Sequence, residues 1–231
     1  MELPTQQALD DAAAAFDSDW GAVDDVLYGL CERHPDHSDR RAVTAKVALI
    51  DRAYSAGLER QVKPDPGEQA IAKIAEFMLA HASEVDAIIA ALDALHEPLD
   101  GAAMTAIVHQ HGRFTTLLRQ VTARQTTPRS FAAKYLHFHR PLVPIYDSYA
   151  AGRLSALVPR DAKQIPVGQP PGSDGEYRSF CMRFFRLYDA CRQGGLSVTV
   201  KGLDSYLWQV PIPQKAGQLL ASGARGTGHV V

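Results

Sequence analysis

The stretch TPRSFAAKYLHFHRPLVPIYDSYAAGRL, residues 127–154, decides the fold of this chain. We expect a helix over 128–139, because a proline, with its fixed φ and missing N–H, is tolerated as the first residue of a helix. A second proline ends this helix, and a third lies in the short extended connector that follows. Asp147 then stands at the N-cap of another predicted helix over 148–157, where its carboxylate can accept a free backbone N–H. The stretch therefore predicts two helices joined by a proline-bracketed connector.

Helical periodicity also dominates the rest of the chain. Apolar residues recur at helical spacing in four further segments, and alternating apolar and polar runs are nearly absent. These segments begin near Val43, Ile71, Val85 and Tyr177. The composition is that of an ordinary globular protein, with 46% hydrophobic and 22% charged residues. The fold class predicted from these patterns is all-α.

The chain is expected to form two helical lobes and a tail. We predict an N-terminal helical lobe over 1–98 and a catalytic-type lobe over 99–210. Residues 211–231 contain several glycines and little apolar periodicity, which predicts a disordered tail. Within the first lobe, Asp17 or Ser18 is predicted to cap the first long helix.

Charge is distributed unevenly along the chain, although the formal net charge is only −2. Residues 1–36 contain nine acids and one base, whereas residues 113–160 contain eight bases and one acid, Asp147. Such an asymmetry indicates a surface that faces a polyanion. The alternative is a solvated basic face that pairs with the acidic N-terminal region.

The segment 127–160 resembles the active-site segment of helix-hairpin-helix DNA glycosylases. In that family a helix with an alanine-rich start leads to a Pro-Val-Asp connector and then to a helix with a basic residue in its second turn. Ala132-Ala133, Asp147 and Arg153 match these features. The resemblance implies a two-lobed helical bundle with the helix-hairpin-helix glycosylase fold. It also implies a DNA N-glycosylase that acts on a flipped, damaged or modified base.

The chemistry of N-glycosidic cleavage explains why one carboxylate in a basic setting is useful. Positive charge builds on the sugar as the base leaves, and a carboxylate on the sugar face can stabilise it and orient a water. The target base must first be flipped out of the duplex. Asp147 is therefore the predicted catalytic residue. The alternative is that Asp147 only caps its helix, and both roles are compatible.

Other residues are predicted to hold DNA around this carboxylate. Arginines and helix N-termini supply the grip on phosphates that flipping requires. The predicted DNA-binding residues are Arg124, Arg129, Ser130, Lys134 and Arg153. The predicted border of the base pocket is Tyr54, Arg60, Tyr146 and Tyr149. Trp208 is expected to be a core plug or a lid over the catalytic lobe.

Departures from the family pattern narrow the expected activity. The family's hairpin turn is glycine-rich, but residues 125–130 contain no glycine. Arg129 or Ser130 stands where lyase members place a nucleophilic lysine, and arginine is a poor amine nucleophile because it stays protonated. We therefore expect a monofunctional enzyme. Three cysteines are too few for the family's iron–sulfur cluster.

No cofactor or metal is expected. The histidines of the pairs 109/111 and 137/139 point apart on a helix, so we expect them to be solvated or to contact phosphate. Without a signal peptide or a long apolar run, the chain is expected to be soluble, cytoplasmic and away from membranes. We expect a monomer whose partner is DNA.

Two further function classes remain open at this stage. The chain could be a non-catalytic nucleic-acid-binding module that kept the scaffold, which the missing hairpin glycines favour. It could also be a helical protein–protein adaptor. The sequence does not reveal the target base or distinguish repair from defence.

Overall fold

The computed structural model describes residues 1, 3–158 and 167–209, and its regular elements within these ranges are all helices. The prediction of an all-α protein is confirmed. The tail predicted over 211–231 and the end of the 127–160 segment lie outside the described residues. The elements in order are α1 (Gln6–Arg33), α2 (Arg40–Ala48), η1 (Leu49–Ala53), η2 (Glu59–Gln61), α3 (Ala70–Ala80), α4 (Ala82–Ala90), α5 (Gly101–Leu118), η3 (Arg119–Val121), α6 (Arg129–His139), α7 (Ser148–Leu157), α8 (Gly175–Gln193) and α9 (Val200–Gln209).

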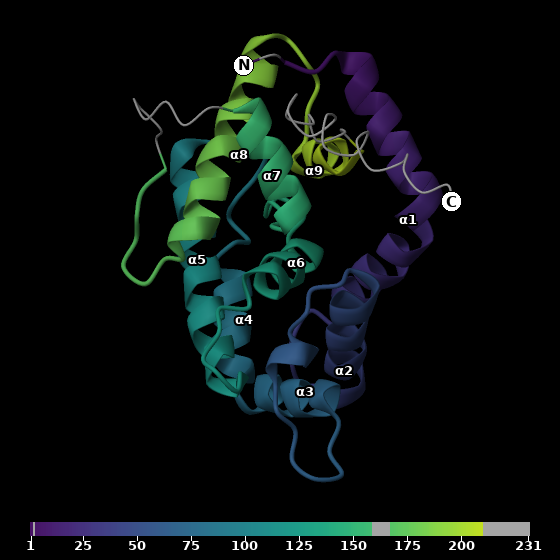
Figure 1. Ribbon diagram of the computed structural model, residues 1–231, viewed down its shortest axis with the longest axis vertical. Helices are drawn as coiled ribbons and strands as arrows, with labels where there is room; N and C mark the ends of the chain where they lie inside the picture. Colours follow the sequence, from purple (N-terminus) through teal and green to yellow (C-terminus); the bar gives the residue numbers. More distant parts are fainter. Residues whose placement is uncertain (2, 159–166, 210–231) are drawn as a thin grey trace, which may run out of the picture.

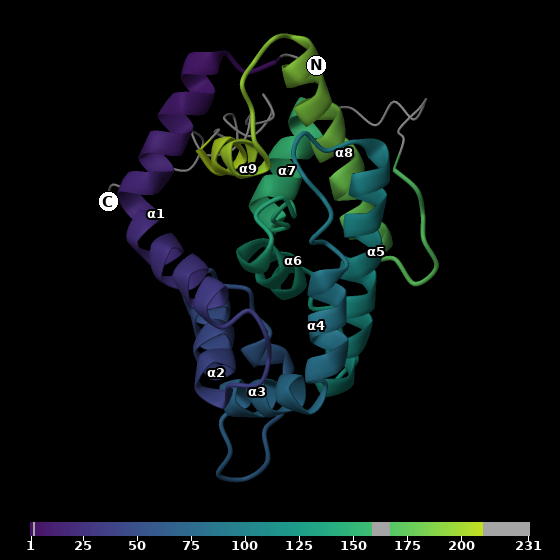
Figure 2. The ribbon, with the colours of Figure 1, turned by 180° about the vertical axis from the view of Figure 1, so that it is seen from behind.

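Helix α6 lies at the centre of the molecule, with the other helices around it (Figures 1 and 2). It packs against α1, α5 and η1, and every residue from Phe131 to His139 is buried. A helix enclosed on all sides gains its stability from packing rather than from an amphipathic surface. The bounds of α6 and α7 confirm, to within one residue, the two helices predicted over 128–139 and 148–157.

The histidines at the end of α6 are internal, so the prediction that they are solvated or contact phosphate is wrong. His137 is 1% exposed and His139 is 6% exposed, and His111 of the other pair is buried as well. His137 donates from Nδ1 to the Val143 carbonyl across 2.7 Å, and its Nε2 accepts the Tyr28 hydroxyl at 2.6 Å. Burial lowers the pKa of His137 to about 4, so the ring is neutral and structural at neutral pH.

The first and last described helices pack against each other. Helix α9 packs crosswise against α1, and α9 also contacts α7 (Figure 1). Helix α1 begins at Gln6, where Thr5 Oγ1 accepts the backbone N–H of Ala8 at 3.1 Å. The predicted start at Asp17 or Ser18 is wrong, because the alanine-rich segment before them has high helix propensity and continues the helix.

One continuous core links the early and late helices. Buried apolar side chains extend from Leu9 on α1 to Leu207 on α9, and the division into lobes at residue 98 stays a prediction. Cys31, Cys181 and Cys191 are free thiols buried in this core. No helix in the described ranges is long and apolar enough to cross a membrane. The described residues also contain no cluster of three or more His, Cys, Asp or Glu side chains that could hold a metal ion.

Candidate active site

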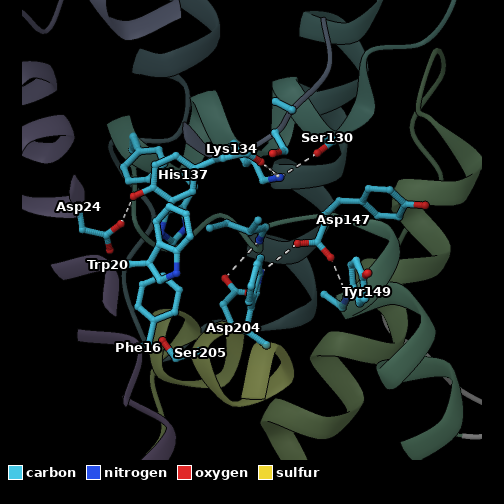
Figure 3. A pocket seen from close by; sticks show the side chains of 18 of the residues that line it. Phe16, Trp20, Asp24, Ser130, Lys134, His137, Asp147, Tyr149, Asp204 and Ser205 are labelled. Atoms are coloured by element: carbon cyan, nitrogen blue, oxygen red, sulfur yellow. Dashed lines mark hydrogen bonds between the residues drawn. The ribbon is translucent and has the colours of Figure 1, made fainter. Parts of the chain in front are cut away.

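A cavity of about 470 Å³ lies among α1, α6, α7 and α9 (Figure 3). Sites for small molecules usually measure about 300–1,000 Å³. The ring centroid of Trp20 lies 5.6 Å from that of Tyr54 and 6.4 Å from that of Trp208. These tilted rings contact one another and form an aromatic wall, against which a planar ligand can stack. The aromatic residues in the wall are Phe16, Trp20, Tyr54, Phe138, Tyr146, Tyr149 and Trp208.

Asp147 caps α7 and lines this cavity at the same time. Its Oδ1 accepts the backbone N–H of Ala150 at 2.7 Å, as expected for an N-cap, and its Oδ2 accepts the indole N–H of Trp208 at 3.1 Å. The residue is 8% exposed. A carboxylate offers about four acceptor sites, and these two bonds leave one on each oxygen. The capping role and a role toward a ligand are therefore compatible.

Lys134 reaches the same cavity from α6 and is buried. Its Nζ donates to the Tyr54 carbonyl at 2.8 Å and to Ser130 Oγ at 3.1 Å. Burial lowers the pKa of Lys134, and the negative charges of Asp147 and Asp51 partly offset this effect. The ammonium group thus anchors the backbone at Tyr54 and places a positive charge in the field of Asp147.

Asp24, Tyr54 and Lys201 make a hydrogen-bonded polar wall of the cavity, in which Asp24 lies across from Asp147 (Figure 3). Asp24 is 5% exposed and accepts both the Tyr54 hydroxyl and the Lys201 ammonium group. Lys201 Nζ also lies 4.5 Å from the centroid of the Tyr28 ring, which is a cation–π contact. The wall has paired charges and presents both donors and acceptors to the edge of a planar ligand.

Three of the four residues predicted to border a base pocket line the cavity together with Asp147. They are Tyr54, Tyr146 and Tyr149. Tyr149 is 61% exposed and so stands at the rim. Arg60 is exposed on the surface and is not part of the lining.

The five residues predicted to hold phosphates are divided between the cavity and the rest of the molecule. Ser130 and Lys134 line the cavity, where they bond to each other. Arg124 is exposed on the surface, beyond the lining. Arg153 donates to the last backbone carbonyls of α9, one of them at 2.5 Å, and so ties α7 to α9.

Arg129, the fifth of these residues, takes part in an ion-pair network. It pairs with Asp174 Oδ2 and with Glu176 Oε2, each at 2.9 Å. Arg140, from the same basic stretch, pairs with Asp93. These acids belong to the start of α8 and to the segment after α4, not to the acidic N-terminal region that the alternative interpretation required. The basic stretch is therefore partly neutralised within the fold.

The residues that α1 and α9 contribute to the cavity were not predicted from the sequence, apart from Trp208, which was expected to be a core plug or a lid and is 41% exposed in the cavity wall. On α1 they are spaced by four positions, and on α9 they follow i, i+3, i+4 and i+7, so each set lies on one helix face. The available signals were two aromatic residues and an acid at four-residue spacing on α1, and polar side chains on one face of α9. The α1 set is Phe16, Trp20 and Asp24, and the α9 set is Lys201, Asp204, Ser205 and Trp208.

Comparison of the chain with protein-family models, with curated proteins and with solved structures found no match. The function is therefore argued from the side chains of this cavity.

Proposed function

We propose that the protein is a DNA N-glycosylase-like hydrolase with a fold similar to that of helix-hairpin-helix DNA glycosylases. Its substrate is a damaged or modified base flipped out of the duplex. The observation that carries this proposal is that Asp147 lines an aromatic cavity of about 470 Å³. Flat rings stabilise an extruded base by stacking, which offsets part of the cost of unstacking it from the duplex.

Asp147 acts on the sugar in this proposal. Positive charge develops on the sugar as the N-glycosidic bond breaks, and the carboxylate stabilises this charge in surroundings where water is scarce. A free acceptor site on the carboxylate holds the attacking water and takes its proton. The bonds from Ala150 and Trp208 fix the direction of both oxygens before the substrate arrives, so little reorganisation is needed.

The proposed reaction stops at an abasic site. Arg129 and Ser130 stand at the start of α6, and neither is an amine nucleophile at neutral pH. The amine of Lys134 already donates to Tyr54 and Ser130. Hydrolysis by water is thus the expected route, without cleavage of the DNA strand.

The test is base release from duplexes that each carry one modified base, with wild type and Asp147→Asn compared. Asparagine caps helices about as well as aspartate, so this variant keeps the fold and loses the charge. We expect abasic sites with the wild type and at least a hundredfold slower release with the variant. Equal release by both proteins would falsify the mechanism, and salt-sensitive DNA binding without any base release would favour a non-catalytic binding module.

The internal ion pairs of Arg129 favour a second candidate, hydrolysis of a free nucleoside or nucleotide in the same cavity. An arginine neutralised by Asp174 and Glu176 contributes little to binding a polyanion. The same assay separates the two candidates when free nucleosides with the same bases are included. Release from free nucleosides but not from duplexes supports the second candidate.

A further inference from the structure

Besides Asp147 and the ion-paired Asp24, a third carboxyl group lines the cavity, that of Asp204 on α9. Asp204 is 6% exposed, and its Oδ2 accepts the backbone N–H of Ile145 at 3.2 Å. Its Oδ1 is buried and has no hydrogen-bond partner. Buried polar atoms are nearly always paired, so a covered and unpaired carboxyl oxygen on a residue that lines a cavity points to a role beyond folding.

The surroundings of Asp204 favour its neutral form. Burial is the largest effect and raises its pKa well above the ordinary value, and the negative charge of Asp147 raises it further. The hydrogen bond from the Ile145 N–H, the second-largest effect, and the charge of Lys201 both lower this pKa, but burial outweighs them. Two neutral groups of α8, Tyr177 and Cys181, and Tyr28 of α1 also lie within electrostatic range.

We propose that Asp204 is the general acid that protonates the departing base, while Asp147 serves the sugar and the water. The inference rests on the proposed N-glycosidic hydrolysis and adds a catalytic residue to it. Two carboxyl groups of unlike environment in one site are the arrangement that glycoside hydrolysis uses to divide acid and base work. The unpaired Oδ1 of Asp204 has no hydrogen bond to give up, and it supplies the donor once it carries the proton and the side chain turns it toward the cavity.

The step balances without any further reactant. The bond between the sugar C1′ and the base nitrogen breaks, and its electron pair moves into the base. The proton of the Asp204 carboxyl passes to the base, which leaves neutral. Water attacks C1′ and gives its proton to Asp147. Exchange with solvent then returns a proton to Asp204 and removes one from Asp147. The overall reaction therefore converts a nucleoside unit and water to a sugar and a free base.

The test uses two matched purines in otherwise identical duplexes, hypoxanthine and 7-methylguanine. Hypoxanthine leaves well only when protonated, whereas 7-methylguanine is already cationic and leaves without an added proton. Asp204→Asn is expected to slow release of hypoxanthine about 10²–10⁴-fold, the usual contribution of a general acid. It should slow release of 7-methylguanine no more than about threefold, because that base needs no acid. Asp189→Asn, which removes a carboxylate on α8 outside the cavity lining, is the control.

The outcomes separate this inference from the proposed function. Equal loss on both purines, or no loss on either, overturns the role of Asp204 even when the wild type is active. A wild type that releases neither purine overturns the proposed action on them. The protonation state of Asp204 can then still be measured without any activity, from its carbon-13 carboxyl resonance. This resonance is assigned because it disappears in Asp204→Asn. An ionised carboxyl at neutral pH overturns the inference.

Discussion

Trp208 on α9 donates its indole N–H to Oδ2 of Asp147 across 3.1 Å, while Oδ1 of Asp147 caps α7. One carboxylate is therefore held by two helices that are far apart in the sequence. Because α9 also packs against α1, the orientation of this carboxylate depends on the first helix of the chain as well.

Replacing Trp208 with phenylalanine removes the donor to Asp147 and keeps a ring in the cavity. We expect kcat for base release to fall roughly 10–100-fold with little change in KM, because the carboxylate loses its fixed direction. Trp20→Phe, in the same cavity wall, should raise KM and leave kcat nearly unchanged. Steady-state kinetics on one duplex substrate measure both effects. Wild-type kinetics for Trp208→Phe would show that the indole bond has no positioning role.

Two replacements of Asp147 separate capping from chemistry. Asp147→Asn keeps an acceptor for the Ala150 N–H and should unfold within about 0.5 kcal/mol of the wild type. Asp147→Ala loses the cap and should be destabilised by about 1 kcal/mol. Both variants should lose base release, because neither carries the charge. Urea unfolding and the release assay measure these quantities. An active Asp147→Asn would leave the residue as a helix cap alone.

Asp204 makes the stability of the protein depend on pH. Burial raises its pKa in the folded state, so the folded protein keeps a proton that the unfolded chain releases near pH 4. The wild type should therefore lose stability relative to Asp204→Asn as the pH rises above about 4, and that difference should be constant at lower pH. Melting temperatures between about pH 3 and about pH 8 test this. A difference that does not change with pH contradicts the assignment.

Lys134 is expected to act as a charge and an anchor rather than as a nucleophile. Borohydride should trap no covalent complex between the wild type and a duplex substrate, and the product strand should stay intact until treated with alkali. Lys201→Arg and Lys134→Arg form a matched pair of cavity variants for this assay. A trapped complex that persists in Lys201→Arg and disappears in Lys134→Arg would make the enzyme bifunctional.

Arg129 and Arg124 should respond differently to replacement by alanine. Arg129→Ala leaves Asp174, whose side chain is 5% exposed, without its partner, and we expect a loss of about 2 kcal/mol in unfolding free energy. Arg124→Ala should leave stability unchanged. It should reduce the slope of log binding constant against log salt concentration by about one, the share of one phosphate contact. Unfolding curves and a salt series of binding constants measure the two effects. An unchanged salt slope for Arg124→Ala would remove that residue from the DNA contact.

Helices α6 and α7 and the connector between them were predicted closely, because the signals that set their ends act within one or two turns of chain. Proline starts and stops a helix through its own ring, and Asp147 caps α7 through an N–H only three residues away. The same local reasoning failed at the start of α1. There a good capping residue, Asp17, lies inside a helix because the surrounding alanines and the contact with α9 favour continuation.

The cavity was predicted only in part, because its walls come from elements that are distant in sequence. Tyr54, Tyr146 and Tyr149 were placed beside Asp147, but the contributions of α1 and α9 were not. The pairing of Arg129 with Asp174 was equally hidden, since 45 residues separate the two. A charge count along the chain cannot tell a free arginine from one that is neutralised by packing.

The amino-acid sequence by itself determined the helical class, the connector between α6 and α7, and the position of Asp147 as a cap. Each of these follows from backbone geometry and hydrogen bonding between near neighbours. Only the tertiary structure decided that α9 returns to α1, which brings Trp208 and Asp204 to the same cavity as Asp147. The reason is physical: periodicity says which face of a helix is buried, but the partner of that face is chosen by the packing of the whole core.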